Sequence, residues 1–255
     1  MGETSFLERL TPDNSPYVLW QEHINRYAFV LSYVSSKVVL DVACGTGYGT
    51  ELISKTADLV VGVDVSRDAL TYAMNHYGKT RNTGFVLADA RYLPFQGSAF
   101  DTVVSFETIE HLIHPEVFLQ EIHSILKLGG KLIVSTPNRK ITISIKGKPA
   151  NPFHLNEFYA DEFSLLLGIF SPKIQFYGQC MYTLKDQLFR ILDTHLPASS
   201  KVLFKKFSRI ALKPSMPQAK NIVTIDSVYR VKKIRNFCQI CIPRFFVAVV
   251  DNEKQ

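Results

Sequence analysis

Two carboxylates and an imidazole lie within five positions of one another near the middle of the chain. They are Glu107, Glu110 and His111, in the segment 106–112. This segment follows the apolar run 101–106, which predicts a buried strand, so the three side chains fall at its carboxyl end. In a turn or a single helical loop they can converge on one point. Carboxylates and an imidazole that converge either bind a divalent ion or transfer a proton.

A second informative stretch lies upstream. Residues 38–49 read VVLDVACGTGYG, a β-branched apolar run that leads into a turn with alternate glycines. Such a run fits a buried parallel strand, and the glycines allow positive φ and a close approach of backbone N–H groups to a ligand. The third glycine, Gly49, comes one residue too early for the dinucleotide pattern G-x-G-x-x-G, which argues against NAD.

The following strand-like runs also end in acids. Residues 60–64 end in Asp64, 19 positions after Gly45, about where a doubly wound fold places the acid that accepts hydrogen bonds from ribose hydroxyls. Residues 84–90 contain Asp89 near their end. Helical patterns separate these runs, and this alternation predicts an α/β, Rossmann-like, doubly wound and mostly parallel seven-stranded sheet with helices on both faces.

The remaining elements follow from periodicity and from glycine and proline positions. Apolar spacing predicts a helix up to residue 36 after an irregular arm, and Pro115 suits the first turn of a helix that Gly129 and Gly130 end. The later predicted strands are 131–136, 173–180 and 245–250, with a helix near 159–167. The predicted organisation is an arm and covering helix (1–36), a catalytic core (37–181), a helical basic insertion or lid (182–240), and a closing strand with tail (241–255).

With these motifs in order, the chain resembles the class I S-adenosylmethionine-dependent methyltransferases, in the branch that contains ubiquinone-pathway and sugar O-methyltransferases. The resemblance covers about residues 20–180 and the closing strand. It implies S-adenosylmethionine as cofactor, with the glycine loop around its methionine part, Asp64 on the ribose and Asp89 facing the adenine. The implied cofactor contacts are Arg26, Asp41, Ala43, Gly45, Gly47, Asp64, Val65, Asp89, Ala90 and Phe106. Arg26 could pair with the methionine carboxylate of the cofactor. Alternatively, it could be only a solvated charge on its helix.

The E-x-x-E-H pattern is similar to the magnesium site of ubiquinone-pathway O-methyltransferases and of small-RNA 3′-terminal 2′-O-methyltransferases. The resemblance implies Glu107, Glu110 and His111 as catalytic residues and as ligands of Mg²⁺ or Mn²⁺, with His154 as a fourth ligand. Coordination would lower the pKa of an acceptor hydroxyl. Without a metal, His111 could act as general base, and the other three residues could have structural roles in a turn, at the surface and in a loop.

The basic residues gather near the carboxyl end. The net charge is +6, yet residues 201–244 hold eleven lysines and arginines against the single acid Asp226. Within them, residues 201–210 have the pattern of an amphipathic basic helix, which suits either a lid or contact with an anionic membrane surface. No interleaving of aromatic and basic residues marks an RNA-binding sheet, so nucleic acid is not the expected partner. The pattern leaves the oligomeric state open.

Composition favours a reducing compartment. The four cysteines do not form a disulfide framework, and Cys238 and Cys241 lack the second pair that a structural zinc site needs. No signal-peptide pattern and no apolar run of membrane-spanning length occur, so we predict a cytoplasmic protein.

The expected activity is therefore methyl transfer to a hydroxyl oxygen of a small-molecule or glycan acceptor, with metal assistance. Two alternatives stay open. One is a methyltransferase that modifies the 3′-terminal ribose of RNA at its 2′-oxygen, and the other is a catalytically silent partner protein that binds the cofactor.

Overall fold

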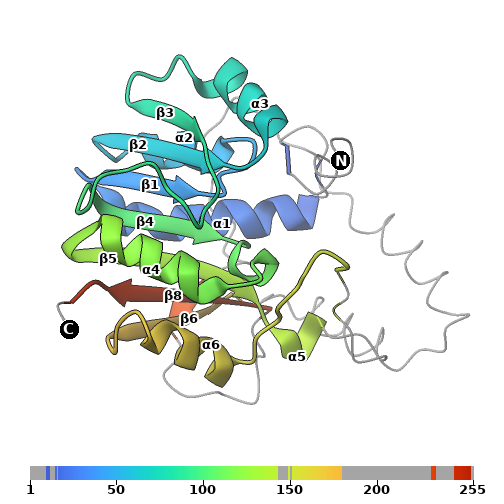
Figure 1. The fold of residues 1–255 in the computed structure, drawn as a ribbon. Helices are drawn as coiled ribbons and strands as arrows, with labels where there is room; N and C mark the ends of the chain where they lie inside the picture. The colour runs from blue at the N-terminus through green and yellow to red at the C-terminus, as the bar shows by residue number, and fades with distance from the viewer. Residues whose placement is uncertain are drawn as a thin grey trace, which may run out of the picture. The chain divides into compact units, whose positions relative to one another are not determined.

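An eight-stranded sheet forms the centre of the protein (Figure 1). The computed structural model describes residues 10–11, 15, 17–142, 149, 151–179, 231–233 and 244–253. The strand order is β3-β2-β1-β4-β5-β8-β6-β7. The strands are β1 (Val38–Val42), β2 (Leu59–Asp64), β3 (Thr83–Leu87), β4 (Phe100–Phe106), β5 (Leu126–Pro137), β6 (Ile174–Gln179), β7 (Val231–Lys233) and β8 (Phe245–Asp251).

The direction of the strands confirms the predicted doubly wound fold. Strands β1 to β5 are parallel to one another, whereas β8 runs antiparallel to both β5 and β6. The predicted seven strands are all present, and the three-residue β7 adds to the edge beside β6. Residues 231–233 thus belong to the core sheet although they fall in the predicted insertion, whose remainder lies outside the described residues. The described elements belong to one compact unit, made of residues 1–180 and 231–255.

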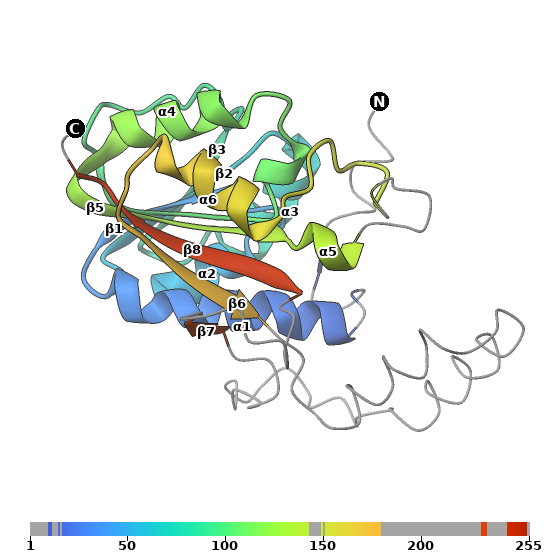
Figure 2. The same cartoon turned by 90° about the horizontal axis from the view of Figure 1, so that it is seen from below.

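Helices cover both faces of the sheet. Figure 2 shows α1 and α2 on one face and α4 and α6 on the other. The helices are α1 (Tyr17–Val34), α2 (Tyr48–Ser54), α3 (Arg67–Tyr77), α4 (Pro115–Ile125), α5 (Arg139–Thr142) and α6 (Ala160–Gly168), with a 3₁₀ turn η1 (Ile109–His111). None of the helices in the described part of the chain has both the length and the apolarity that a membrane crossing requires.

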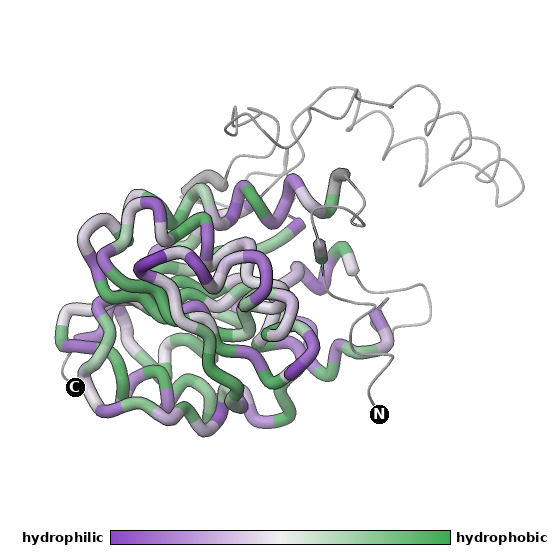
Figure 3. Tube along the Cα trace, turned by 90° about the horizontal axis from the view of Figure 1, so that it is seen from above, coloured by the Kyte–Doolittle hydropathy of each residue, from purple (hydrophilic) through white to green (hydrophobic). Residues whose placement is uncertain are grey.

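The core consists of two apolar layers, one on each face of the sheet. In β1, Val39 packs toward Val30 of α1, whereas its neighbour Leu40 packs in the layer that contains Phe118 of α4. Alternate residues of one strand therefore enter opposite layers, which is why parallel strands read as continuous apolar runs. Figure 3 shows these central strands in green, with more purple along the outer helices and loops.

The end of α4 differs from the prediction. Pro115 does occupy the first turn, but the helix ends at Ile125, and Leu126 already begins β5. Gly129, with φ of +76°, lies inside that strand, next to Gly130. A Cβ at Gly130 would approach the carbonyl oxygen of Lys127 to 2.8 Å. The glycine pair therefore allows a tight bend within the strand rather than ending the helix.

Candidate functional site

The glycine loop connects β1 to α2 at the carboxyl edge of the sheet. Ala43, Gly45 and Gly47 all have positive φ, of 59°, 55° and 82°. Gly49 has a different role, because a Cβ there would overlap the ring of Tyr27 from α1. The alternate glycines thus shape the loop, and the early third glycine lets α1 pack closely over the start of α2.

Asp64 holds this loop from the end of β2. Its Oδ2 accepts a hydrogen bond from the backbone N–H of Gly45 at 2.9 Å, and its Oδ1 accepts one from Ser66 at 2.8 Å. A carboxylate oxygen can accept more than one hydrogen bond. The position fits the predicted contact with ribose hydroxyls.

Asp41 lies behind the loop. It is fully buried and accepts hydrogen bonds from Tyr27 at 3.1 Å and Thr50 at 2.7 Å. Burial raises its pKa to about 7, against the lowering effect of these two hydroxyl donors. Asp41 is not among the residues that line the two site cavities described below. It therefore ties α1 and α2 to β1, and its predicted cofactor contact would be indirect.

Asp89 follows β3 and is held by its neighbour Arg91. The guanidinium donates from Nε at 3.0 Å and from Nη2 at 2.6 Å, and the backbone N–H of Arg91 donates at 2.9 Å. These hydrogen bonds lower the pKa of Asp89 and keep it ionised. An adenine amino group would share this carboxylate with Arg91.

Two cavities meet at the carboxyl edge of the parallel strands. Their volumes are about 510 and 340 Å³, and both are lined by Ala43, Asp64, Glu107 and His111. The larger cavity is also lined by Leu10, Leu19, His23, Tyr27, Cys44, Gly45, Thr46, Tyr48, Phe106, Pro137, Thr142, Asn151, His154, Arg244 and Phe245. The smaller one is also lined by Val42, Val63, Val65, Ala88, Asp89, Ala90, Arg91, Thr108, Leu112, Ile113 and Leu155. The predicted ribose and adenine contacts thus border the smaller cavity.

Glu107 stands where the two cavities meet, directly after β4. Its φ is +52°, a left-handed conformation that is costly for a residue with a side chain. Ser135 of β5 holds it from two directions: Oγ donates to the carboxylate at 2.8 Å and accepts from the Glu107 backbone N–H at 3.3 Å. The fold therefore retains a strained backbone that aims this carboxylate between the cavities.

Three of the four predicted metal ligands come together. One ligand atom each of Glu110, His111 and His154 lies within 4.8 Å of the others, and Glu107 is outside this cluster. The loop that carries His154 is attached to η1 by the backbone, because the Glu110 carbonyl accepts hydrogen bonds from Leu155 and Asn156 at 2.9 Å each. Main-chain hydrogen bonds thus join two segments that lie 45 positions apart in the sequence, from Glu110 to Leu155.

The two histidines are oriented through their Nδ1 atoms. In His154, Nδ1 lies 3.0 Å from a carboxylate oxygen of the buried Glu157, and in His111 it lies 3.1 Å from the Phe153 carbonyl oxygen. A ring that donates from Nδ1 has its basic lone pair on Nε2. The rings meet edge to face, with centroids 5.0 Å apart. Histidines that ligate metals are oriented in the same way by carboxylates and carbonyls.

Glu110 is completely buried in this cluster. Its Oε2 accepts a hydrogen bond from Thr136 at 3.2 Å, and its buried Oε1 has no hydrogen-bond partner among the described residues. Burial, and next the nearby charge of Glu107, raise the pKa of Glu110 well above its ordinary value. A cation at the cluster would favour the ionised form that burial opposes.

Arg26 has no contact with either cavity in the described structure. It is fully buried, donates from Nη1 to Oε1 of Gln179 at 2.7 Å, and stacks on the ring of Phe245 at 4.3 Å from the centroid. Phe245 lines the larger cavity, so Arg26 supports its wall from behind. A contact with the methionine carboxylate would need a rearrangement of these partners.

Several lining residues were not predicted from the sequence. His23 and Tyr48 lie 2.9 Å apart at the larger cavity, and burial lowers the pKa of His23 well below its ordinary value. Arg244 and Phe245 enter from the start of β8, far along the chain. His23 lies on the helix that was expected to cover the cofactor, which is the one signal that could have identified it.

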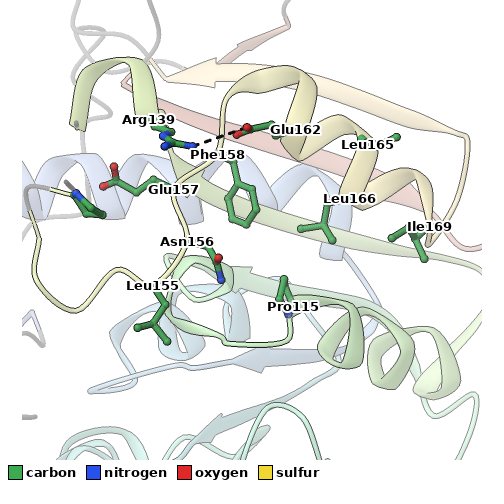
Figure 4. A pocket seen from close by; sticks show the side chains of 11 residues that line it. Pro115, Arg139, Leu155, Asn156, Glu157, Phe158, Glu162, Leu165, Leu166 and Ile169 are labelled. Atoms are coloured by element: carbon green, nitrogen blue, oxygen red, sulfur yellow. Dashed lines mark ion pairs between the residues drawn. The ribbon is translucent and has the colours of Figure 1, made fainter. Parts of the chain in front are cut away.

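Another cavity, of about 730 Å³, opens beside the site between α6, the start of α4 and the loop 151–158 (Figure 4). Its lining is mainly apolar and includes Phe158 and Leu166. Glu157 lines this cavity and also binds His154, so the loop forms the wall between the cavity and the cluster. Arg139 and Glu162 lie 3.9 Å apart at its rim.

Sheet order, glycine loop and the acid after β2 together define a class I methyltransferase fold. Comparison with known proteins agrees, since residues 40–134 match the methyltransferase domain family. A Mycobacterium tuberculosis protein named "probable S-adenosylmethionine-dependent methyltransferase" is 35% identical over 161 residues, which are 63% of this chain and 58% of the relative. Residues 40–134 thus carry the domain of the class I S-adenosylmethionine-dependent methyltransferases.

More distant relatives are consistent with this assignment. A ubiquinone biosynthesis O-methyltransferase of Coxiella burnetii is 34% identical over 107 residues, 42% of this chain and 46% of the relative. The solved YcgJ protein of Bacillus subtilis has a TM-score of 0.60 at 14% identity and covers 91% of this chain and 100% of its own. That likeness shows the fold alone. The chain spans about three fifths of the length of the mycobacterial relatives, of which it covers 58 to 62%.

Proposed function

We propose that the protein transfers the methyl group of S-adenosylmethionine to a hydroxyl oxygen of a small-molecule or sugar acceptor, with a divalent ion held by Glu110, His111 and His154. The convergence of these three side chains beside the predicted cofactor cavity carries the proposal. Mg²⁺ is the ion that the sequence resemblance implies, and the two imidazoles suit Mn²⁺ better.

The residues present fit such an ion in two respects. The buried Oε1 of Glu110 has no partner among the described residues, which is costly unless a cation or donor reaches it. Both histidines have Nδ1 fixed by oxygen atoms, so that Nε2 is the basic atom. When bound, the ion would lower the pKa of a coordinated hydroxyl group.

The protein's own residues would then position and polarise the reactants. Asp64 would hold the cofactor ribose, and Glu107, at the junction of the cavities, would place negative charge near the cationic sulfonium. The remaining requirement is alignment of the acceptor oxygen with the methyl group, which proximity supplies. Without a metal, Nε2 of His111 would accept the hydroxyl proton, because this residue lines both cavities.

Calorimetric titration tests the cofactor and the metal separately. We expect S-adenosylhomocysteine to bind the wild type, and Asp64→Ala to weaken this binding strongly while the thermal unfolding curve is retained. Mn²⁺ binding, measured by electron paramagnetic resonance, should require Glu110. Glu110→Gln should lose the ion and keep the cofactor, whereas the exposed Glu116→Gln, also from the η1–α4 region, should keep both.

Each measurement has a result that would contradict its part of the proposal. Absence of S-adenosylhomocysteine binding would remove the methyltransferase function and favour the silent-partner alternative. Mn²⁺ binding that is equal in Glu110→Gln and the wild type would remove the proposed metal site. Methyl transfer that persists in chelator but is lost in His111→Asn would then favour the general-base mechanism.

A further inference from the structure

Arg244 is the only lysine or arginine among the described residues that line the larger site cavity. Its backbone is fixed on both sides: its N–H donates to the Gln179 carbonyl at 2.9 Å, and its carbonyl accepts from Asn138 at 3.0 Å. It therefore stands between the ends of β5 and β6, at the start of β8. This edge of an open α/β sheet is where ligands bind.

The guanidinium of Arg244 is accessible from the cavity. The side chain is 36% exposed, and Nη1 donates to Oε1 of the buried Glu22 at 2.9 Å. The central carbon of the Arg244 guanidinium, Cζ, lies 5.6 Å from the centre of the Phe245 ring. A guanidinium has five donors in a planar fork that matches a carboxylate or phosphate, so one ion pair does not exhaust it.

Arg244 shares its carboxylate partner with a second guanidinium group. Glu22 pairs with Arg244, and Arg26 also acts on it through space, so that two guanidinium groups face one carboxylate. The buried Nε and Nη2 of Arg26 find no hydrogen-bond partner among the described residues. A ligand anion at the cavity could pair with the guanidinium donors of Arg244 that Glu22 does not use.

The acids of the cavity lie at other strands. Asp64 ends β2 and Glu107 follows β4, whereas Arg244 precedes β8. In the sheet, β5 lies between β4 and β8. The acidic part suits a cofactor that carries a sulfonium cation. The basic part is at the end of the cavity where Pro137, which pairs with Phe245, and Thr142, which donates to Asn138, also line the wall. Opposite charges at the two ends would orient two different ligands.

We propose that Arg244 forms an anion-binding subsite for the acceptor, which therefore carries a carboxylate or a phosphate group in addition to the hydroxyl that is methylated. This inference rests on the proposed function, because it takes the other end of the cavity as the cofactor site. A carboxylate would pair with the guanidinium fork in the plane of the group, and a phosphate would do so through two of its oxygens.

The test is calorimetry on protein saturated with S-adenosylhomocysteine. Glucuronate and glucose form a matched pair, because they share ring hydroxyls and differ in the carboxylate, and inorganic phosphate probes the other anion. We expect glucuronate and phosphate to bind and glucose to bind at least tenfold more weakly. Arg244→Gln should weaken both anions about tenfold or more, as loss of a charge-assisted hydrogen bond does.

Three further variants give distinct expectations. Arg139→Gln is a matched control, since Arg139 has the same 36% exposure but lies at the neighbouring cavity, and it should bind both anions like the wild type. Glu22→Gln removes the carboxylate that competes for Arg244 and should strengthen anion binding several-fold. If Arg244→Gln does not fold, as circular dichroism would show, Arg244→Lys retains the charge and should keep phosphate better than glucuronate.

Four results would overturn the inference: no anion binding by the wild type, equal binding by Arg244→Gln, weaker binding by Glu22→Gln, or displacement of the anion by S-adenosylhomocysteine. The last result would assign Arg244 to the methionine carboxylate of the cofactor. Failure of S-adenosylhomocysteine to bind would instead refute the proposed function. Phosphate titration without cofactor would then still decide whether Arg244 binds anions.

Discussion

The buried Asp41 should make the stability of the protein depend on pH, and Asp41→Asn should remove that dependence. Burial raises the pKa of this group from 3.8 to about 7. Between these values the unfolded chain has lost the Asp41 proton while the folded protein retains it. Stability from this group is therefore full below pH 3.8, falls as pH rises, and reaches its lower limit above about pH 7.

The size of the effect follows from the pKa difference. A shift of about 3 units corresponds to about 4 kcal/mol, because one unit is about 1.4 kcal/mol. Asparagine has nearly the same shape and carries no charge. One of its polar atoms can still accept from a hydroxyl, and the other can donate to one, since the Tyr27 and Thr50 hydroxyls can rotate.

Urea unfolding of the wild type and of Asp41→Asn at pH 5 and pH 8 measures the contribution of Asp41 to the free energy of unfolding. The difference in unfolding free energy between the two pH values should be smaller in Asp41→Asn than in the wild type, by roughly 2 to 4 kcal/mol. Titrating groups that do not interact with Asp41 cancel in this double difference. An unchanged pH dependence, or a variant that loses more than about 1 kcal/mol at pH 8, would refute the reasoning.

Two other predictions concern packing and the cluster. Gly49→Ala should destabilise the protein by about 1 to 3 kcal/mol in urea unfolding, because the methyl group overlaps the Tyr27 ring, whereas Gly84→Ala, with open space at its Cβ, should stay within about 0.5 kcal/mol. Equal effects of the two would contradict the packing argument. Glu157→Gln should weaken Mn²⁺ binding about 10- to 100-fold with S-adenosylhomocysteine binding unchanged, since it removes the carboxylate that orients His154. Unaltered Mn²⁺ affinity would show that this orientation is not needed.

The parallel strands of the sheet could be predicted from the sequence. Strands such as β1 and β2 are buried on both faces, so their apolar runs are short, continuous and bounded by glycine or acid, and they are easily recognised. The end of α4 was placed wrongly because Gly129 and Gly130 look like a helix stop. In the structure they permit a bend inside β5, whose backbone pairs with β8 from Lys131 onward.

The candidate site was only partly predictable, for a physical reason. Local motifs reveal residues such as Asp64 and His111, which follow their own strands. Which distant residues approach them depends on loop closure: His154 reaches the cluster because its loop donates two backbone hydrogen bonds to Glu110. Arg244 reaches the cavity through the pairing of β8 with β5 and β6. His154 was indicated by the family resemblance rather than by a local pattern, and the contact of Arg244 leaves no pattern in the sequence.

Three buried carboxylates around the site differ in how fully their oxygen atoms are hydrogen-bonded. Both oxygens of Asp41 accept from hydroxyl groups, and Oε1 of Glu22 pairs with Arg244 although its Oε2 has no hydrogen-bond partner among the described residues. Glu110, with a raised pKa, has one hydroxyl donor and an oxygen without a partner in the described structure. A buried carboxylate that is poorly compensated costs stability, and proteins retain such groups mainly where they function. Its position beside two oriented imidazoles, rather than its burial, is what makes Glu110 the ligand we expect a cation to use.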